Sequence, residues 1–208
     1  MPRRSVLLFG GLCLVVAAVL AVTTLVVTSG RDRATTGGNA VSSTGQPSVG
    51  GPFALVDQDG RPVDQTILDG KWTLVFFGFT WCPDYCPTTL AALKATQDRL
   101  GDRADALQIV FISVDPERDR PQVLKDYLSS DGFPEGVIGL TGTPAQVRAT
   151  ADAYRAYYQK VGEGEGYTMD HSLTVYLMGP DGKFRNALGG DLGPDRSAEV
   201  IRRAMERG

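Results

Sequence analysis

The sequence predicts an α/β domain in which a mixed central sheet is flanked by helices. Two continuous apolar runs, TLVFFGF at 73–79 and LQIVFISV at 107–114, have the composition of strands that are buried on both faces. A segment with apolar residues at helical spacing follows each run, and this alternation indicates a parallel core with helical crossovers. Apolar runs at 173–179 and 183–189 flank a P-D-G turn, which predicts a hairpin that adds antiparallel strands.

Shorter patterns predict the remaining elements of the domain. The segment FALVDQDGRPV, which starts at Phe53, predicts an N-terminal hairpin of two strands around a D-G turn, and residues 137–142 predict a third buried strand. Asp119 and Thr143 stand where they can cap helices, and Pro121 suits a first helical turn. Apolar residues at helical spacing predict four helices, at 88–100, at 119–130, from Thr143 to Tyr158 and at 195–207.

The first 50 residues are expected to lie outside this domain. Residues 6–27 carry no charge and are long enough to cross a bilayer, so they predict a single transmembrane anchor, with a cleaved signal peptide as the alternative. Residues 1–5 are then expected in the cytoplasm, although basic residues flank the apolar segment on both sides. Residues 28–50 are rich in Gly, Ser and Thr and predict a flexible linker to the domain at 51–208.

Composition excludes some classes of function. The chain has 208 residues, of which 42% are hydrophobic, and a formal net charge of −3. This length fits one domain with a substantial core, and the lack of a long basic run argues against nucleic-acid binding. With three cysteines and one histidine in the chain, any metal site that uses an imidazole must use His171. Cys13 lies within the apolar segment and is expected to face lipid or to pack there as a small apolar residue.

Cys82 and Cys86 form a C-x-x-x-C motif directly after the strand predicted at 73–79. A redox-type cysteine pair at the carboxyl end of a buried strand, opening a helix, is typical of a thioredoxin-like fold. If Pro83 to Pro87 begins the helix, both sulfurs lie on one helix face, where the helix N-terminus favours thiolates. Three interpretations are open at this point: a permanent disulfide, a dithiol redox switch, and part of a site for a soft metal ion.

His171 lies just before the strand predicted at 173–179, in a loop that faces the cysteine-bearing helix of a thioredoxin-like sheet. Thioredoxin-type oxidoreductases carry a cis-proline in this loop, whereas this chain has no proline from Tyr167 to Met178. We therefore predict His171 as a third ligand, the alternative being a loop histidine held by hydrogen bonds. Two thiolates and an imidazole suit trigonal Cu(I), and Cu(II) would recruit a further oxygen ligand. Zinc is the main rival, but no obvious general base for zinc hydrolysis stands near the motifs.

Three motifs occur in this order along the chain: GFTWCPDYCPTTL, SVDPERDRPQVLKDY and MDHSLTVYLMGPDGKF. Together they resemble the Sco/SenC family of membrane-anchored copper chaperones, over about residues 51–205. The resemblance implies a thioredoxin-like domain that binds one copper ion, as Cu(I) or Cu(II), through Cys82, Cys86 and His171. It also implies a role in maturing the dinuclear copper centre of cytochrome c oxidase subunit II, by delivery of copper or by reduction of that centre's cysteines.

Trp81 and Tyr85 are the positions at which the first motif departs from the common family form, where a histidine and an aliphatic residue are frequent. They are expected to form an exposed docking patch, or else to pack around the helix start. The expected partners are cytochrome c oxidase subunit II and other copper chaperones or thiol reductants. An extracytoplasmic thiol–disulfide reductase or redox sensor, in which Cys82 and Cys86 cycle, is the alternative function, so enzymatic activity is left open. The anchor and the cysteine chemistry indicate a domain on the extracytoplasmic side of a membrane, and the lack of an Arg/Ser-rich transit segment before the anchor favours a bacterial cell membrane.

Five other residues near the motifs have expected roles. Asp170 can orient His171 as a hydrogen-bond acceptor, or else accept hydrogen bonds from backbone amides of the loop. Met169 is expected to pack despite its soft sulfur, and Asp84 is expected to be exposed to solvent. Asp115 and Arg118 are expected to form a structural ion pair beside the site.

Overall fold

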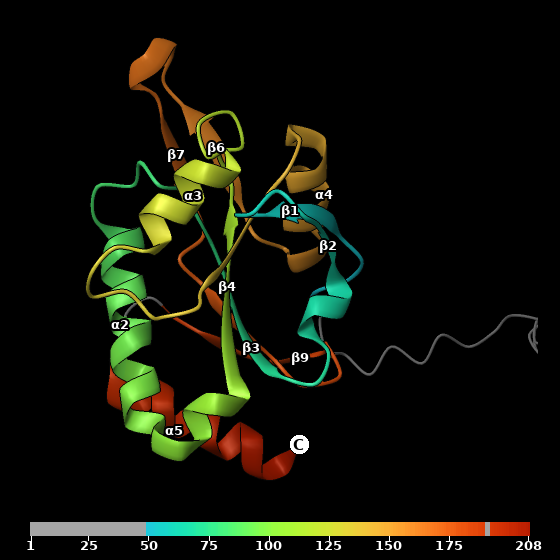
Figure 1. Cartoon of the computed structure of the whole chain (residues 1–208), viewed down its shortest axis with the longest axis vertical. Coiled ribbons are helices and arrows are strands. Elements are labelled where there is room, and N and C mark those ends of the chain that lie inside the picture. The colour runs from blue at the N-terminus through green and yellow to red at the C-terminus, as the bar shows by residue number, and fades with distance from the viewer. Residues whose placement is uncertain (1–48, 190–191) are drawn as a thin grey trace, which may run out of the picture. The chain divides into compact units, whose positions relative to one another are not determined.

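The structure is a computed structural model that describes residues 49–189 and 192–208 (Figure 1). The predicted cytoplasmic segment 1–5 and the predicted anchor 6–27 lie outside the described residues, as does the predicted linker apart from its last two residues. None of the helices in the described ranges is both long enough and apolar enough to cross a membrane.

A mixed sheet forms the centre of the fold, as the sequence predicts. Its strands are β1 (Ala54–Asp57), β2 (Pro62–Asp64), β3 (Trp72–Gly78), β4 (Leu107–Ser113), β5 (Ile138–Thr141), β8 (Val175–Met178) and β9 (Phe184–Leu188). They are arranged in the order β2-β1-β5-β4-β3-β8-β9. β3, β4 and β5 run parallel to one another, and every other neighbouring pair in this sheet is antiparallel.

β3 and β4 form the middle of the core because their side chains are apolar on both faces. Every residue of β3 is buried, and Gln108 is the one residue of β4 that is half-buried. The two strands pair in register along their length, so Gly78 lies opposite Ser113 at their carboxyl ends. The segments that follow, residues 79–84 and 114–120, therefore leave the sheet side by side at one edge, where ligand sites of open α/β sheets are found.

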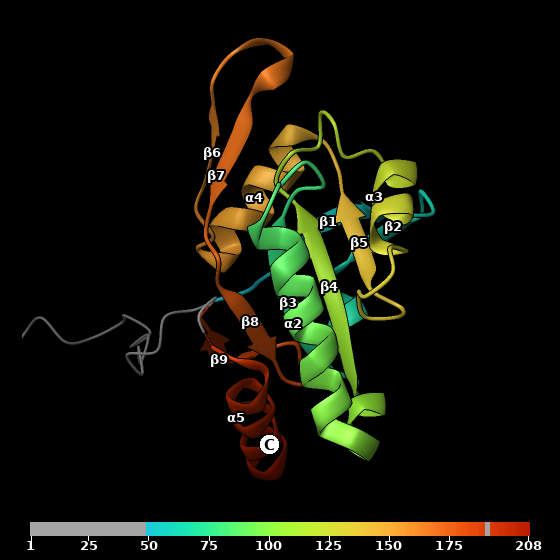
Figure 2. The same cartoon turned by 90° about the vertical axis from the view of Figure 1, so that its left-hand side faces the viewer.

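The helices of the described residues cover both faces of this sheet: α2 (Tyr85–Leu100), α3 (Pro121–Leu128), α4 (Pro144–Tyr154) and α5 (Pro194–Arg207). α2 and α5 pack against each other, and α4 lies on the opposite side of the central strands from α2 (Figures 1 and 2). Three short 3-10 helices complete the connections: η1 (Gln65–Leu68), η2 (Gly101–Ala106) and η3 (Gly164–Gly166).

The start of α4 agrees with the sequence, but its end does not. Thr143 caps the helix as predicted, because its Oγ1 accepts the backbone N–H of Gln146 while the Gln146 side chain bonds back to Thr143. The helix ends at Tyr154, since Arg155 adopts a left-handed conformation with φ of 55° that terminates it. Tyr158, which we predicted to continue the helix, lies instead in a strand.

That strand belongs to a third hairpin, in addition to the two that the sequence predicts. β6 (Tyr158–Val161) and β7 (Thr168–His171) pair antiparallel in a separate sheet, and the hairpin extends away from the seven-stranded sheet (Figures 1 and 2). We call residues 158–171 the histidine arm. His171 therefore ends a strand, and its predicted placement in a loop is wrong. The alternation of apolar and polar residues from Tyr167 to Asp170 was the available signal in the sequence.

Candidate metal site

The cysteine loop, residues 79–84, joins the end of β3 to the start of α2. α2 begins at Tyr85, so Cys86 lies in its first turn and Cys82 precedes the helix. The prediction that both cysteines occupy one helix face is therefore wrong, because Asp84 (φ −141°) has not yet entered the helical conformation. The sulfurs still approach each other, since Sγ of Cys82 accepts the backbone N–H of Cys86 at 3.4 Å. That N–H is one of the donors without a partner inside the helix.

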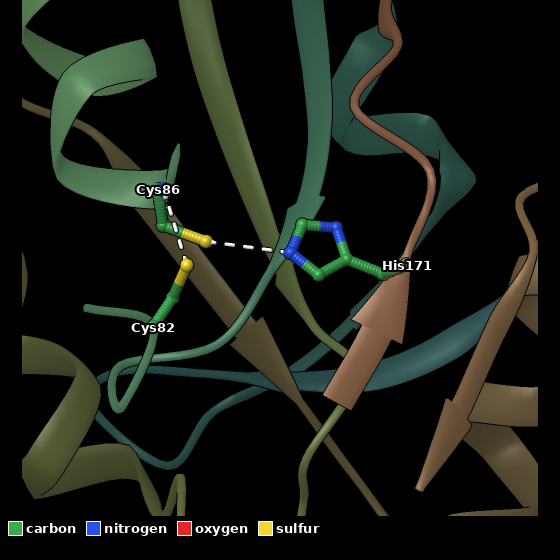
Figure 3. Close-up of side chains that lie close together, drawn as sticks. All are labelled: Cys82, Cys86 and His171. Carbon is green, nitrogen blue, oxygen red and sulfur yellow. Dashed lines mark hydrogen bonds between the residues drawn. The ribbon is translucent and has the colours of Figure 1, made fainter. Parts of the chain in front are cut away.

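His171 approaches the cysteines from the other side of the site (Figure 3). Its Nδ1 lies 2.9 Å from the carbonyl oxygen of Ser172, which can only accept, so Nδ1 donates the hydrogen bond. Nε2 then faces Cys86 Sγ at 3.6 Å. The rings of Phe76 and Phe79 meet the imidazole edge-on, with centroids 6.4 and 5.7 Å away, so the ring is held by apolar contacts as well.

The three predicted ligands thus come together, with one ligand atom from each lying within 4.8 Å of the other two. Both cysteines are buried and neither is in a disulfide. Hydrogen bonds from the Cys86 side chain and from the backbone N–H groups of Cys86 and Asp84 outweigh burial and lower the pKa of Cys82 to about 5. The hydrogen bond to Cys82, together with burial, raises the pKa of Cys86. At neutral pH the pair therefore holds one thiolate, on Cys82, and one proton, on Cys86.

Gly78 leaves the space that the Cys86 sulfur occupies. A Cβ at this position would lie 2.8 Å from Cys86 Sγ and 2.8 Å from Cε2 of Phe111. The sequence alone indicates no role for this glycine, because only the packing of α2 on the end of β3 creates the requirement.

Asp119 has a different role from the one we predicted. Arg120 occupies the N-cap position of α3, and no side chain caps the helix there. The buried carboxylate of Asp119 turns instead towards the cysteine loop, where it accepts the backbone N–H and the hydroxyl of Thr80 at 3.0 and 2.6 Å, and the hydroxyl of Ser113 at 2.6 Å. Burial raises its pKa, opposed by the hydrogen bonds from Ser113 and Thr80. Asp119 therefore anchors the cysteine loop.

Asp170 does not orient the imidazole, contrary to our prediction. Neighbouring residues of a strand point to opposite faces, so the exposed Asp170 faces away from His171, and the carbonyl of Ser172 takes the role. Met169 is buried in the core and Asp84 is exposed, as predicted for both.

Two further predictions near the site are confirmed by the structure. Asp115 and Arg118 form an ion pair that is largely buried. Trp81 and Tyr85 lie beside the cysteines and are exposed, at 65% and 58%, so the alternative that they pack around the helix start is excluded. Whether they contact a partner stays a prediction.

Comparisons with known proteins show the same motifs and fold elsewhere. The SCO1/SenC family model matches residues 41–206. Protein SCO1 homolog 1, mitochondrial, of Arabidopsis thaliana is 44% identical over 144 residues, which are 68% of this chain and 42% of that protein. The chain spans about half the length of the first curated relatives it matches.

Solved structures match this chain over nearly the full length of the other protein. The crystal structure of Arabidopsis thaliana ScoI with copper bound is 39% identical, with a TM-score of 0.72, and the match covers 77% of this chain and 99% of that one. A structure of BsSco, described as a Sco-family cytochrome c oxidase assembly protein with a disulfide switch, is 28% identical, with a TM-score of 0.61, covering 77% and 95%.

Fold and site together define a thioredoxin-like domain that carries a cluster of two cysteines and one histidine beyond the end of a central strand. The chain belongs to the SCO1/SenC family, because that family's model covers most of its length. The resemblance inferred from the three motifs is thereby confirmed.

Proposed function

We propose that this protein binds one copper ion through Sγ of Cys82, Sγ of Cys86 and Nε2 of His171. Its role would be to deliver copper to, or to reduce the cysteines of, the dinuclear copper centre of cytochrome c oxidase subunit II. One observation carries the proposal: the sulfurs of the neighbouring Cys82 and Cys86 and a nitrogen of His171, 85 residues further along the chain, lie within 4.8 Å of one another.

The donor set suits copper better than a harder ion. Two thiolates and an imidazole provide the soft ligation that Cu(I) prefers, and copper supplies the capacity to change between one-electron oxidation states. Cys82 already holds a thiolate at neutral pH, so ligation requires the loss of one proton, from Cys86. The carbonyl of Ser172 keeps the proton on Nδ1 of His171, which leaves Nε2 as the ligating nitrogen.

A protein that hands over a metal ion must let a partner reach its ligands. Cys86 is fully buried at the start of α2 and His171 is half-buried, whereas Cys82 retains slight exposure on the loop between Trp81 and Tyr85. These two exposed aromatic side chains would contact the partner beside the cysteine that is nearest the surface. Subunit II, other copper chaperones and thiol reductants are the proposed partners.

The N-terminal segments support a location outside the cytoplasm. In the proposed arrangement, residues 1–5 are cytoplasmic, residues 6–27 anchor the chain in a bacterial cell membrane, and residues 28–50 link the anchor to the copper-binding domain at 51–208. The linker would let the domain reach a membrane-bound partner.

Titration of the full chain with Cu(II) tests the proposal. We expect an intense thiolate-to-copper charge-transfer band at one copper per chain, which Cys82→Ala, Cys86→Ala and His171→Ala each abolish or shift. Cys13→Ala is the matched control and should keep the band, because this cysteine lies in the predicted anchor. Equal copper uptake by the wild type, Cys86→Ala and His171→Ala would contradict the proposal.

A thiol–disulfide reductase is the second candidate, and the hydrogen-bonded pair of a thiolate and a thiol favours it. In that reaction Cys82 attacks a partner disulfide, a mixed disulfide forms, and Cys86 releases the reduced partner by closing the Cys82–Cys86 disulfide. Metal-free protein that restores cytochrome c oxidase in a strain lacking the gene, with His171→Ala as active as the wild type, would favour this candidate over copper delivery.

A further inference from the structure

We propose that Tyr167, Asp115 and Arg118 form a latch that holds the histidine arm where His171 reaches the cysteine sulfurs. The inference rests on the proposed function, because it assigns positioning residues to the same site. The contacts of these three residues join them to one another and not to the donor atoms of the proposed ligands, so their effect would pass through the position of the arm.

The position of His171 depends on the arm because His171 is its last residue. The strands of the arm bond to each other in a two-stranded sheet that is separate from the seven-stranded sheet. The hydrogen bonds of the main sheet therefore do not fix the arm, and side-chain contacts must contribute.

The latch lies at the start of β7, at the end of the arm away from His171, and holds both the side chain and the backbone of Tyr167. The Tyr167 hydroxyl donates to Oδ1 of Asp115 at 2.6 Å, and Nη1 of Arg118 donates to the Tyr167 carbonyl at 3.0 Å. The guanidinium also stacks on the Tyr167 ring, 3.6 Å from its centroid, while its Nε pairs with the other oxygen of Asp115. On the β6 side, Lys160 pairs with Glu117 at 2.8 Å, so both strands of the arm are tied to one segment.

The same segment, residues 113–119, holds the cysteine loop. Asp119 accepts two hydrogen bonds from Thr80, and the guanidinium of Arg118 lies 5.3 Å from the ring centroid of Trp81, the residue before Cys82. One segment therefore contacts both halves of the site and would set the separation between the cysteines and the histidine.

Tyr167→Phe tests the latch, because it removes one hydroxyl and keeps the ring. Tyr157→Phe is the matched control, since it removes an exposed hydroxyl that bonds only Gln159 in the described contacts. In the metal-free full chain, we expect amide hydrogen exchange in β6 and β7 to become about tenfold faster with Tyr167→Phe, and exchange in β3 and β4 to stay unchanged. The control should change neither.

Cu(I) affinity, measured by competition with a chromogenic chelator, separates positioning from a general loss of stability. Tyr167→Phe should weaken Cu(I) binding about tenfold, the equivalent of one hydrogen bond, and Asp115→Asn should act in the same direction. In a His171→Ala background, Tyr167→Phe should have no further effect, because the latch acts only through His171.

The outcomes distinguish the two proposals. If His171→Ala weakens Cu(I) binding but Tyr167→Phe and Asp115→Asn do not, the copper site stands and the latch is refuted. The latch is also refuted if Tyr167→Phe lowers Cu(I) affinity equally with and without His171, or if it speeds amide hydrogen exchange throughout the core. If His171→Ala binds Cu(I) as the wild type does, both proposals fail.

Discussion

Gly78→Ala is the most direct test of how the fold makes room for the site. Its Cβ would lie 2.8 Å from Cys86 Sγ and from the Phe111 ring, against the 3.4 Å at which ordinary contact begins, so each neighbour must retreat by 3.4 − 2.8 = 0.6 Å. Both neighbours are fully buried, with 0% of either exposed, so no open space receives them. The substitution should therefore move the sulfur that lies 3.6 Å from His171.

The size of the effect follows from overpacking. Added methyl groups in a packed core cost about 1–3 kcal/mol. Because alanine has a lower chain entropy than glycine in the unfolded state, the substitution also stabilises the folded protein by about 0.4–1 kcal/mol, which offsets part of this cost. For a chain of this size, a net loss of about 1–2 kcal/mol lowers Tm by about 2–8 °C. We also expect weaker copper binding, because one ligand is displaced.

Calorimetry and copper titration of the full chain provide the assay, and Gly51→Ala is the matched control. A Cβ at Gly51 would meet only the Cβ of Ala153, at an ordinary 3.6 Å. Equal Tm values and equal copper affinities for the two variants would refute the reasoning that Gly78 is required by the position of Cys86.

Three further predictions concern the cysteine loop and a distant cap. With its pKa lowered to about 5, Cys82 should be alkylated by iodoacetamide at a rate that stays constant above about pH 6 and falls as the pH drops through 5. Mass spectrometry should find little adduct on Cys86, whose pKa is raised. An adduct confined to Cys86 would contradict this prediction. Asp119→Ala leaves the half-buried donors of Thr80 and the buried hydroxyl of Ser113 without their acceptor, so it should cost about 1–3 kcal/mol in urea unfolding and also weaken copper binding. Unchanged copper affinity would show that the hydrogen bonds of Asp119 do not position the site. Thr143→Ala should lower the free energy of unfolding by about 1 kcal/mol through loss of the capping box and leave copper affinity unchanged. Weaker copper binding in this variant would contradict the expectation that the cap acts only on its own helix.

The central strands and most helices were predictable because their signals are local. The apolar runs at 73–79 and 107–114 became β3 and β4, and the capping box at Thr143 is complete within four residues. The ends of elements were less predictable. Tyr158 continues the helical spacing of α4, yet a left-handed Arg155 stops the helix, and a backbone torsion of this kind leaves no periodic signal.

Residues that hold the site in place were missed or misassigned because their partners are distant in the sequence. Asp119 has the composition and position of a helix cap, but its carboxylate serves Thr80, which is 39 residues earlier. Tyr167 drew no attention, since nothing near it in the chain indicates the Asp115 that accepts its hydroxyl.

The sequence alone determined the donor atoms of this protein. The C-x-x-x-C motif follows a strand that its own apolar residues define, and His171 is the one histidine in the chain. Tertiary structure decided whether these donors meet, because Cys86 and His171 are 85 residues apart and their contact depends on how an arm that bonds mainly to itself is held against the segment after β4. The identity of a ligand is a property of one residue, whereas the distance between ligands is a property of the whole packed domain.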